Sequence, residues 1–346
     1  MRFLRKILAP FSALYGSITS TRNTLYDKGV LKSTVFKTPI IVVGNLSVGG
    51  TGKTPQIEYL VRLLQKKYTI AILSRGYKRT SKGFLIADKN TKVETIGDEP
   101  MQYFLKFKNI TIAVDADRVN GITQLASLEK KPNVILLDDA FQHRKVEAGL
   151  NILLTSYNDL YIDDKMLPAG NLREHVVGAN RAQIIVVSKC PEDLNEKEQF
   201  EITKKLHVGL HQTVFFSKIS YGSLIIGAHS TLSIAHLPNY KVILVTGIAN
   251  TKPLEVFLDA KHVDYQHLKF TDHHHFSANE LQKITAQFSE INSDKKLILT
   301  TEKDYVRSFK GVANFYYLPI ETTFINHQID FNTLVKKYVE QGTADS

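Results

Sequence analysis

An apolar run followed by a glycine-rich turn at residues 40–55 constrains the fold of this chain more than any other feature. The run Ile40–Val43 is typical of a buried strand. The turn after it contains Gly49, Gly50, Thr51, Gly52, Lys53 and Thr54. Glycines let backbone N–H groups surround phosphate oxygens, a lysine adds charge at the terminal phosphates, and a threonine hydroxyl can hold Mg²⁺. The turn therefore predicts a nucleoside triphosphate site, although the strict motif has glycine at the position of Ser47.

The rest of the first half predicts a parallel sheet covered by helices on both faces. Residues 53–67 have the apolar spacing of a helix. Short β-rich runs then recur, separated by helical or loop segments, at 69–73, 110–114, 134–137, 151–154 and 184–187. Strands that are apolar on both faces and alternate with helices are typical of such α/β sheets.

The second half predicts a smaller α/β domain. Strands are expected near 242–245, 297–300 and 315–318, and helices near 253–259, 278–288 and 332–340. We therefore expect a first domain at 1–215, an extended linker at 216–230 and a second domain at 231–346.

The composition is that of an ordinary globular chain with an excess of positive charge. Its 346 residues carry 44 lysines and arginines against 34 acidic residues, a net charge of +10. The one cysteine, Cys190, excludes an internal disulfide and fits a reducing compartment. The charge predicts an anionic partner, which nucleic acid, anionic lipid or a phosphorylated substrate would satisfy.

The N-terminal segment favours lipid among these partners. Residues 1–37 hold seven basic residues against Asp27 alone, and the apolar residues from Phe3 to Ile18 recur at helical spacing. Such a basic amphipathic helix either lies in a membrane interface or packs on the protein's own core. Pro10 is expected to kink or divide this helix.

Two carboxylates end the apolar strand at residues 134–137. Asp138 and Asp139 occupy the position at which nucleotide-binding folds of this kind bind Mg²⁺ near the phosphates, and a solvated turn is the alternative. Gln142 and His143 follow and could position a nucleophile or contact phosphate.

Four further segments carry reactive side chains but are ambiguous one by one. Asp98, in Gly97–Pro100, fits a general base or an acidic helix N-terminus. Arg173 and Glu174 fit a phosphate contact with a metal ligand, or a surface ion pair. Asp272–His275 fits a metal site, a catalytic histidine or a polar loop. A basic loop after a strand fits an anionic substrate or plain solvent exposure; it contains Arg75, Tyr77, Lys78 and Arg79.

Taken in chain order, these segments resemble the tetraacyldisaccharide 4′-kinase (LpxK) family of lipid A biosynthesis. The matching segments include Val43–Pro55, Leu73–Arg79, Gly97–Pro100, Asp138–His143, Pro168–Glu174, Thr246–Asn250, Asp272–His273 and Thr301–Asp304. The resemblance implies a P-loop NTPase main domain of three α/β/α layers, a smaller C-terminal α/β domain and a two-stranded linker. It also implies transfer of the ATP γ-phosphate to the 4′-hydroxyl of a tetraacyldisaccharide 1-phosphate, giving lipid IVA.

The resemblance also implies a role for each candidate residue. Asp98 becomes the base that accepts the hydroxyl proton, with His273 as its partner. Lys53 and Arg173 contact the phosphates. The metal residues are Thr54, Asp138, Asp139, Gln142 and Glu174. We assign substrate contacts to Asn45, Arg75, Tyr77, Lys78, Arg79 and His143.

The expected setting is a monomer bound peripherally at the cytoplasmic face of the inner membrane, where the lipid substrate lies. The chain departs from the family pattern at Ala140, usually glycine, and at His175, usually proline. The alternative is a membrane-associated regulatory ATPase of the ParA/MinD type. Such loops carry a signature lysine where this chain has Val48. A nucleic-acid partner is not expected, because the sequence has no recognisable motif for one.

Overall fold

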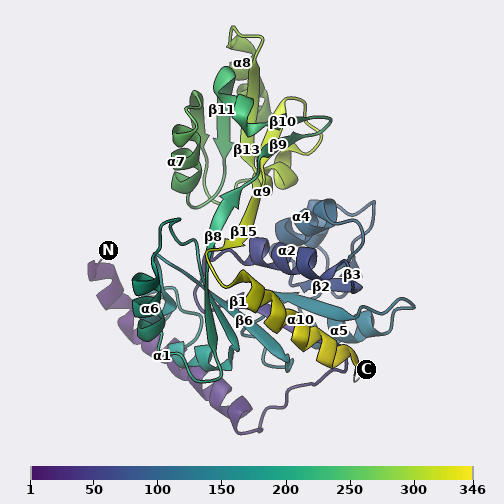
Figure 1. The fold of residues 1–346 in the computed structure, drawn as a ribbon, viewed down its shortest axis with the longest axis vertical. Helices are drawn as coiled ribbons and strands as arrows, with labels where there is room; N and C mark the ends of the chain where they lie inside the picture. Colours follow the sequence, from purple (N-terminus) through teal and green to yellow (C-terminus); the bar gives the residue numbers. More distant parts are fainter. Residues whose placement is uncertain (1, 345–346) are drawn as a thin grey trace. The chain divides into compact units, whose positions relative to one another are not determined.

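The computed structural model describes residues 2–344, and their side chains from residue 8 onward. The chain forms two compact units. The first combines Met1–Ile219 with Thr322–Ser346, and the second is Ser220–Glu321. Each unit is built around its own sheet (Figure 1).

The first unit contains a nine-stranded sheet in the order β15-β8-β7-β6-β1-β5-β2-β4-β3. Its strands are β1 (Ile40–Asn45), β2 (Ile70–Ser74), β3 (Leu85–Ile86), β4 (Thr111–Val114), β5 (Val134–Asp138), β6 (Leu150–Ser156), β7 (Ile184–Ser188), β8 (Thr213–Tyr221) and β15 (Ile320–Phe324). The strands from β8 to β4 pair in parallel, and β3 joins β4 antiparallel. The predicted parallel sheet is confirmed.

Side chains from both faces of this sheet are buried, which gives the unit its three layers. Every residue of β1 is buried, and alternate side chains enter different cores: Ile40 and Val42 one, Ile41 and Val43 the other. The first core lies under α5, and the second under α2, α4 and α10 (Figure 1). Helices of this unit are α1 (Arg2–Asp27), α2 (Lys53–Leu64), α3 (Val93–Ile96), α4 (Asp98–Lys106), α5 (Arg118–Ala126), α6 (Glu196–Lys205) and α10 (Gln328–Ala344).

The second unit is the predicted smaller α/β domain. Its six strands lie in the order β10-β9-β14-β13-β11-β12. Their bounds are β9 (Leu224–Gly227), β10 (Thr231–Ser233), β11 (Lys241–Thr246), β12 (Tyr265–Lys269), β13 (Lys296–Thr301) and β14 (Phe315–Leu318). The helices are α7 (Lys252–Ala260), α8 (Ala278–Glu290) and the short α9 (Glu302–Asp304), which a π-helical turn at Tyr305–Phe309 extends.

The chain crosses between the units twice, once in β8 and once in β15, which confirms the two-stranded linker. The unit boundaries nevertheless differ from the expected second domain at 231–346. Helix α10 belongs to the first unit, because its apolar face, Phe331, Val335 and Val339, is buried in the core beside α2. An amphipathic pattern shows that a helix has a buried face without showing which sheet covers it.

Helix α1 leaves an apolar face uncovered. It runs as one helix through Pro10 and is not divided there. Phe11, Leu14 and Ile18 share a face by their spacing and are 61, 62 and 62% exposed, so they do not pack on this unit's core. The side chains of residues 3–7, where the predicted apolar face begins, lie outside the described residues. Among the helices that the structure describes, none combines the length and apolar character needed to cross a membrane.

Candidate functional site

The candidate residues of the first unit gather at the carboxyl edge of its sheet. Parallel strands bring their carboxyl ends together, and ligands of open α/β sheets bind there. Here that edge holds Asn45 of β1, Ser74 of β2 and Asp138 of β5, on three neighbouring strands. The hydroxyl of Ser74 donates to Asp138 Oδ2 at 3.2 Å.

The glycine-rich turn leads from β1 into α2. Gly49 and Gly52 adopt positive φ angles of 116° and 85°, which favour glycine. Gly52 caps α2, so Lys53 and Thr54 open the helix whose free N–H groups attract phosphate. Gly44, before the turn, is required for close approach, since a Cβ there would lie 2.6 Å from Phe141 Cβ.

Backbone pairing ties the turn to the segment that carries Arg173. The Val48 N–H donates to the Asn171 carbonyl at 2.8 Å, and the Arg173 N–H donates to the Leu46 carbonyl at 2.7 Å. These bonds bring Arg173 and the turn to one place, although more than 100 residues separate them in the chain.

Asp139 forms the centre of a charged cluster at the turn. Arg173 Nη1 donates to its two carboxylate oxygens at 2.9 and 3.0 Å, and Lys53 Nζ lies 3.6 Å from Oδ1. Lys53 also donates to Asn45 Oδ1 at 3.2 Å. Burial alone would raise the pKa of Asp139, but the Lys53 and Arg173 cations outweigh it and lower that pKa. Asp139 therefore holds both cations at the glycine-rich turn Gly49–Thr54, which we call the phosphate loop.

Asp138 has a different environment. Its side chain is almost completely buried, and burial together with the Asp139 and Glu99 charges raises its pKa to about 7. Arg118 is buried beside it and donates from Nη2 to the Asp138 carbonyl at 3.2 Å. Arg118 was not among the residues predicted from the sequence. Its place just after β4, at the same sheet edge, is the signal that would have found it.

Glu174 connects α1 to the phosphate loop. This buried carboxylate accepts from Gln142 Nε2 at 2.9 Å and Arg181 Nη2 at 2.7 Å on Oε1, and from Asn23 Nδ2 at 2.7 Å on Oε2. Gln142 also donates to the Asn45 carbonyl at 2.9 Å. Both Glu174 oxygens thus have protein donors, and its assignment as a metal ligand gains no support from this geometry.

Replacing Asn23 tests whether this link holds α1 in place. In Asn23→Ala the buried Oε2 of Glu174 loses its donor, which costs about 1–3 kcal/mol. We expect amide exchange in α1 to become roughly 5- to 150-fold faster, measured by hydrogen exchange with mass spectrometry. Thr24→Ala, an exposed neighbour on the same helix, is the matched control. Equal exchange in both variants would show that the bond does not secure the helix.

The basic loop lies beside the start of α4. Asp98 is the first residue of that helix, so the acidic helix N-terminus considered from the sequence is present, and it remains compatible with a base. Gly97 packs closely on the loop, since a Cβ there would lie 2.9 Å from the Tyr77 carbonyl oxygen. The side chains of Arg75, Tyr77 and Lys78 are exposed.

Arg79 and His143 are more enclosed than their assignment to substrate suggests. Arg79 donates to the carbonyls of Gly83 at 2.7 Å and Val114 at 3.3 Å, which gives it a structural role in its own loop. Burial and then the Arg118 and Arg75 cations lower the pKa of His143 to about 4, so its ring is neutral near pH 7.

His273 lies in the second unit, just after β12. Its Nε2 is 3.2 Å from Lys303 Nζ, and its Nδ1 is 3.4 Å from Arg307 Nη2. Arg307 also donates to Asp304 Oδ1 at 3.1 Å. Lys303 belongs to the Thr301–Asp304 motif, and Arg307 lies in the π-helical turn that follows it.

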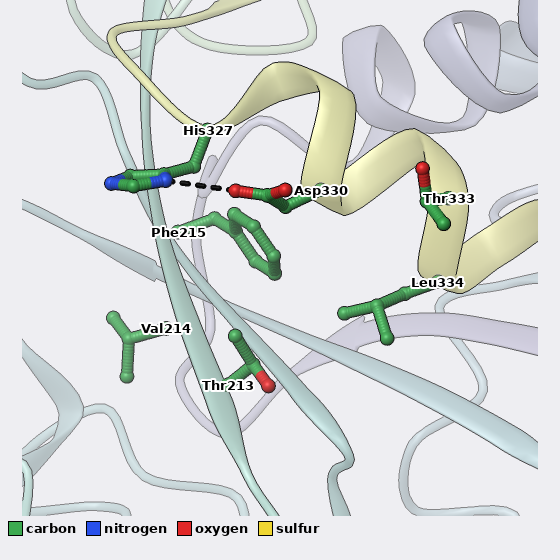
Figure 2. Close-up of a pocket in the computed structure, with 7 residues that line it drawn as sticks. All are labelled: Thr213, Val214, Phe215, His327, Asp330, Thr333 and Leu334. Atoms are coloured by element: carbon green, nitrogen blue, oxygen red, sulfur yellow. Dashed lines mark hydrogen bonds and ion pairs between the residues drawn. The ribbon is translucent and has the colours of Figure 1, made fainter.

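A cavity of about 410 Å³ lies elsewhere on the first unit (Figure 2). Its walls come from the start of β8 and from α10 with the residue before it, and His327 Nδ1 lies 2.8 Å from Asp330 Oδ2. Thr213 aligns with Ile184 at the amino end of parallel β7. The cavity is therefore at the sheet edge opposite the phosphate loop, and the site described above does not depend on it.

Comparisons with known proteins agree with one another. A model of the family described as tetraacyldisaccharide-1-P 4′-kinase (LpxK) matches residues 4–340. A tetraacyldisaccharide 4′-kinase of Flavobacterium johnsoniae is 55% identical over 344 residues, covering 99% of both chains. One of Flavobacterium psychrophilum is 50% identical, covering 100% of both.

A solved structure agrees as well. LpxK from Aquifex aeolicus, described as an "apo" form in complex with ATP, superposes with a TM-score of 0.78 at 32% identity. The match covers 97% of this chain and 99% of that one. These matches decide against the regulatory ATPase alternative. The chain belongs to the tetraacyldisaccharide 4′-kinase family of enzymes.

Proposed function

We propose that this protein transfers the γ-phosphate of ATP to the 4′-hydroxyl of a tetraacylated glucosamine disaccharide 1-phosphate, giving lipid IVA. The observation that carries the proposal is the cluster of Lys53, Asp139 and Arg173 at the phosphate loop. Phosphoryl transfer requires little covalent chemistry from the protein, so positioned cations account for most of the catalysis. Membership of the family identifies the acceptor of the phosphate, the 4′-hydroxyl of the lipid disaccharide.

The residues at the loop fit Mg²⁺. Asp138 is a buried carboxylate with a raised pKa, an environment that a cation would relieve, and Thr54 opens α2 next to Lys53. In the described chain, no three His, Cys, Asp or Glu side chains form a cage of their own. Mg²⁺ on nucleotides typically uses one or two carboxylates and the phosphates. We assign Thr54 and Asp138 as Mg²⁺ ligands, whereas Asp139 holds the Lys53 and Arg173 side chains. A bound Mg²⁺ would neutralise the charge that develops on the phosphates.

Asp98 is proposed as the base and His273 as its partner. As the acceptor oxygen bonds to the γ-phosphorus, the bond from that phosphorus to the β–γ bridging oxygen breaks, and ADP leaves. The hydroxyl proton passes to Asp98. A neutral imidazole has one acceptor nitrogen, so His273 can accept from Lys303 or from Arg307, and either bond would orient its ring. Arg75, Tyr77 and Lys78, with Asn45 and His143, are proposed to contact the disaccharide.

The reaction itself provides the direct test. Purified protein, γ-labelled ATP, Mg²⁺ and detergent-dispersed tetraacyldisaccharide 1-phosphate are expected to yield a lipid labelled at the 4′ position. Labelled phosphate released at the same rate with and without the lipid, and no labelled lipid, would contradict the proposal.

We also propose that the protein works as a monomer on the cytoplasmic face of the inner membrane, held there by α1. The exposed Phe11, Leu14 and Ile18 supply an apolar face, and exposed Arg22 and Lys28 follow on the same segment. Apolar side chains and basic residues together bind anionic lipid surfaces.

Changing the three apolar residues of α1 to serine tests the membrane surface. Burying one large apolar side chain contributes about 1.5–3 kcal/mol, so the triple variant is expected to bind anionic phospholipid vesicles at least about a hundredfold more weakly. Co-sedimentation measures binding, and the affinity for ATP is expected to stay unchanged. Phe200→Ser on α6, at a position 65% exposed, is the matched control. Vesicle binding that the triple variant retains would rule out this face.

A further inference from the structure

The loop after β7 has no role in the mechanism above, although it lies at the same carboxyl edge as the phosphate loop. The motif there, Ser188–Pro191, lacks the aspartate of a guanine-reading sequence. Ser188 ends β7 and is almost completely buried. Its hydroxyl lies 2.7 Å from the Thr51 carbonyl oxygen, to which it donates. The loop after β7 therefore fixes one peptide of the phosphate loop.

Lys189 fixes the preceding peptide. Its backbone is left-handed, with φ 57°, and its ammonium donates to the Gly50 carbonyl. In a planar trans peptide the C=O and the N–H point in opposite directions. Holding the carbonyls of Gly50 and Thr51 against the β7 loop therefore fixes the directions of the Thr51 and Gly52 N–H groups.

Lys189 also adds a further cation, besides Lys53 and Arg173, to the phosphate loop. The Lys189 ammonium contacts the Gly50 carbonyl, and the Lys53 ammonium lies at the same turn, 3.2 Å from Asn45 Oδ1. Although the Lys189 side chain is exposed in part, desolvation and then the Lys53 charge lower its pKa. Like charges in such a place repel unless an anion lies between or beside them. Asp139 lies beside Lys53, and a triphosphate would supply an anion to both lysines. Lys189 approaches the turn from the end of β7, whereas Lys53 is the first residue of α2.

We propose that Lys189 is a positioning residue for the nucleotide: it orients the tip of the phosphate loop through the Gly50 carbonyl and strengthens the positive field around the triphosphate. This inference rests on the proposed function, because it assumes that the loop binds ATP. In this proposal the Ser188–Pro191 motif acts on the phosphates of the nucleotide and not on its adenine.

Direct measurement of nucleotide affinity tests this proposal without the lipid reaction. Titration calorimetry compares Mg²⁺–ATP binding to the full chain and to Lys189→Met, which keeps the length of the side chain but not its charge. We expect Kd for ATP to rise roughly 10- to 100-fold, because the variant loses both the charge-assisted hydrogen bond that orients the loop and the positive charge beside the triphosphate. Lys189→Arg is expected to remain within about threefold of the unchanged protein, since it keeps the donor and the charge.

The control is Lys197→Met, which removes an exposed lysine from α6. In the kinase assay the KM for ATP is expected to rise in Lys189→Met while the KM for the lipid does not. ATP binding that is unchanged in Lys189→Met, or equally weakened in Lys189→Arg, would overturn the proposal. Lys189→Gln replaces the methionine variant if that does not fold, with the same criterion. Failure of the unchanged protein to bind ATP would instead refute the proposed function.

Discussion

Asp98→Asn is expected to lower kcat by about 10²–10⁴ while leaving the KM for ATP close to its original value. The substitution keeps the size of the side chain and its place at the start of α4. It removes the ability to accept a proton. A sugar hydroxyl is a weak acid, so its proton must be taken up as the bond to phosphorus forms. Because the proposed phosphate site is the loop after β1, we expect the loss to lie in the chemical step.

The control variants for Asp98 separate a base from a general negative charge. Glu94→Gln removes an exposed carboxylate from the preceding short helix, α3, and is expected to leave kcat unchanged. Glu99→Gln removes the adjacent carboxylate, whose charge contributes to the raised pKa of Asp138, and is expected to have a smaller effect than Asp98→Asn. Steady-state kinetics with both substrates varied measures each parameter. A loss confined to the KM of the lipid would make Asp98 a binding residue.

Much of this site could be predicted because parallel strands collect their carboxyl ends at one edge. Asn45 and Asp138 follow apolar runs in the sequence, so their meeting requires only that the two strands lie in one sheet. The opposed environments of Asp138 and Asp139 could not be predicted. They depend on the left-handed backbone of Asp139, φ 49°, and on Arg173, which reaches Asp139 because backbone hydrogen bonds tie its segment to residues 46–48.

Contacts between residues distant in sequence explain the remaining differences between the predicted and the observed structure. Glu174 has the spacing of a family metal residue, but Asn23, 151 residues away, and Arg181 determine what its oxygens accept. Hydrogen bonds between loops leave no periodic pattern in the sequence. Helix α10 is a similar case. Its apolar face could be recognised in the sequence, but the core beside α2 in which that face is buried could not.

Lys53→Met is expected to lower kcat by about 10²–10³, because it removes a fixed cation from the transferring phosphate. Lys53 opens α2 and is held by Asn45 and Asp139, so its ammonium is placed before ATP arrives. Such preorganisation requires no reorientation during the reaction, which makes the charge effective in the transition state. Methionine keeps most of the apolar stem, so packing around the turn changes little. Kinetics at saturating lipid and varied ATP measures the loss.

Comparison with other cations shows whether position or charge matters. Lys197→Met removes the same charge from an exposed site on α6 and is expected to leave kcat unchanged. Lys53→Arg keeps the charge, but its planar fork is larger than an ammonium and does not replace a point contact, so we expect little recovery. Full recovery in Lys53→Arg would mean that the loop needs only positive charge at this point. In that case Arg173, which already contacts Asp139, would be the residue that contacts the phosphate in the transition state.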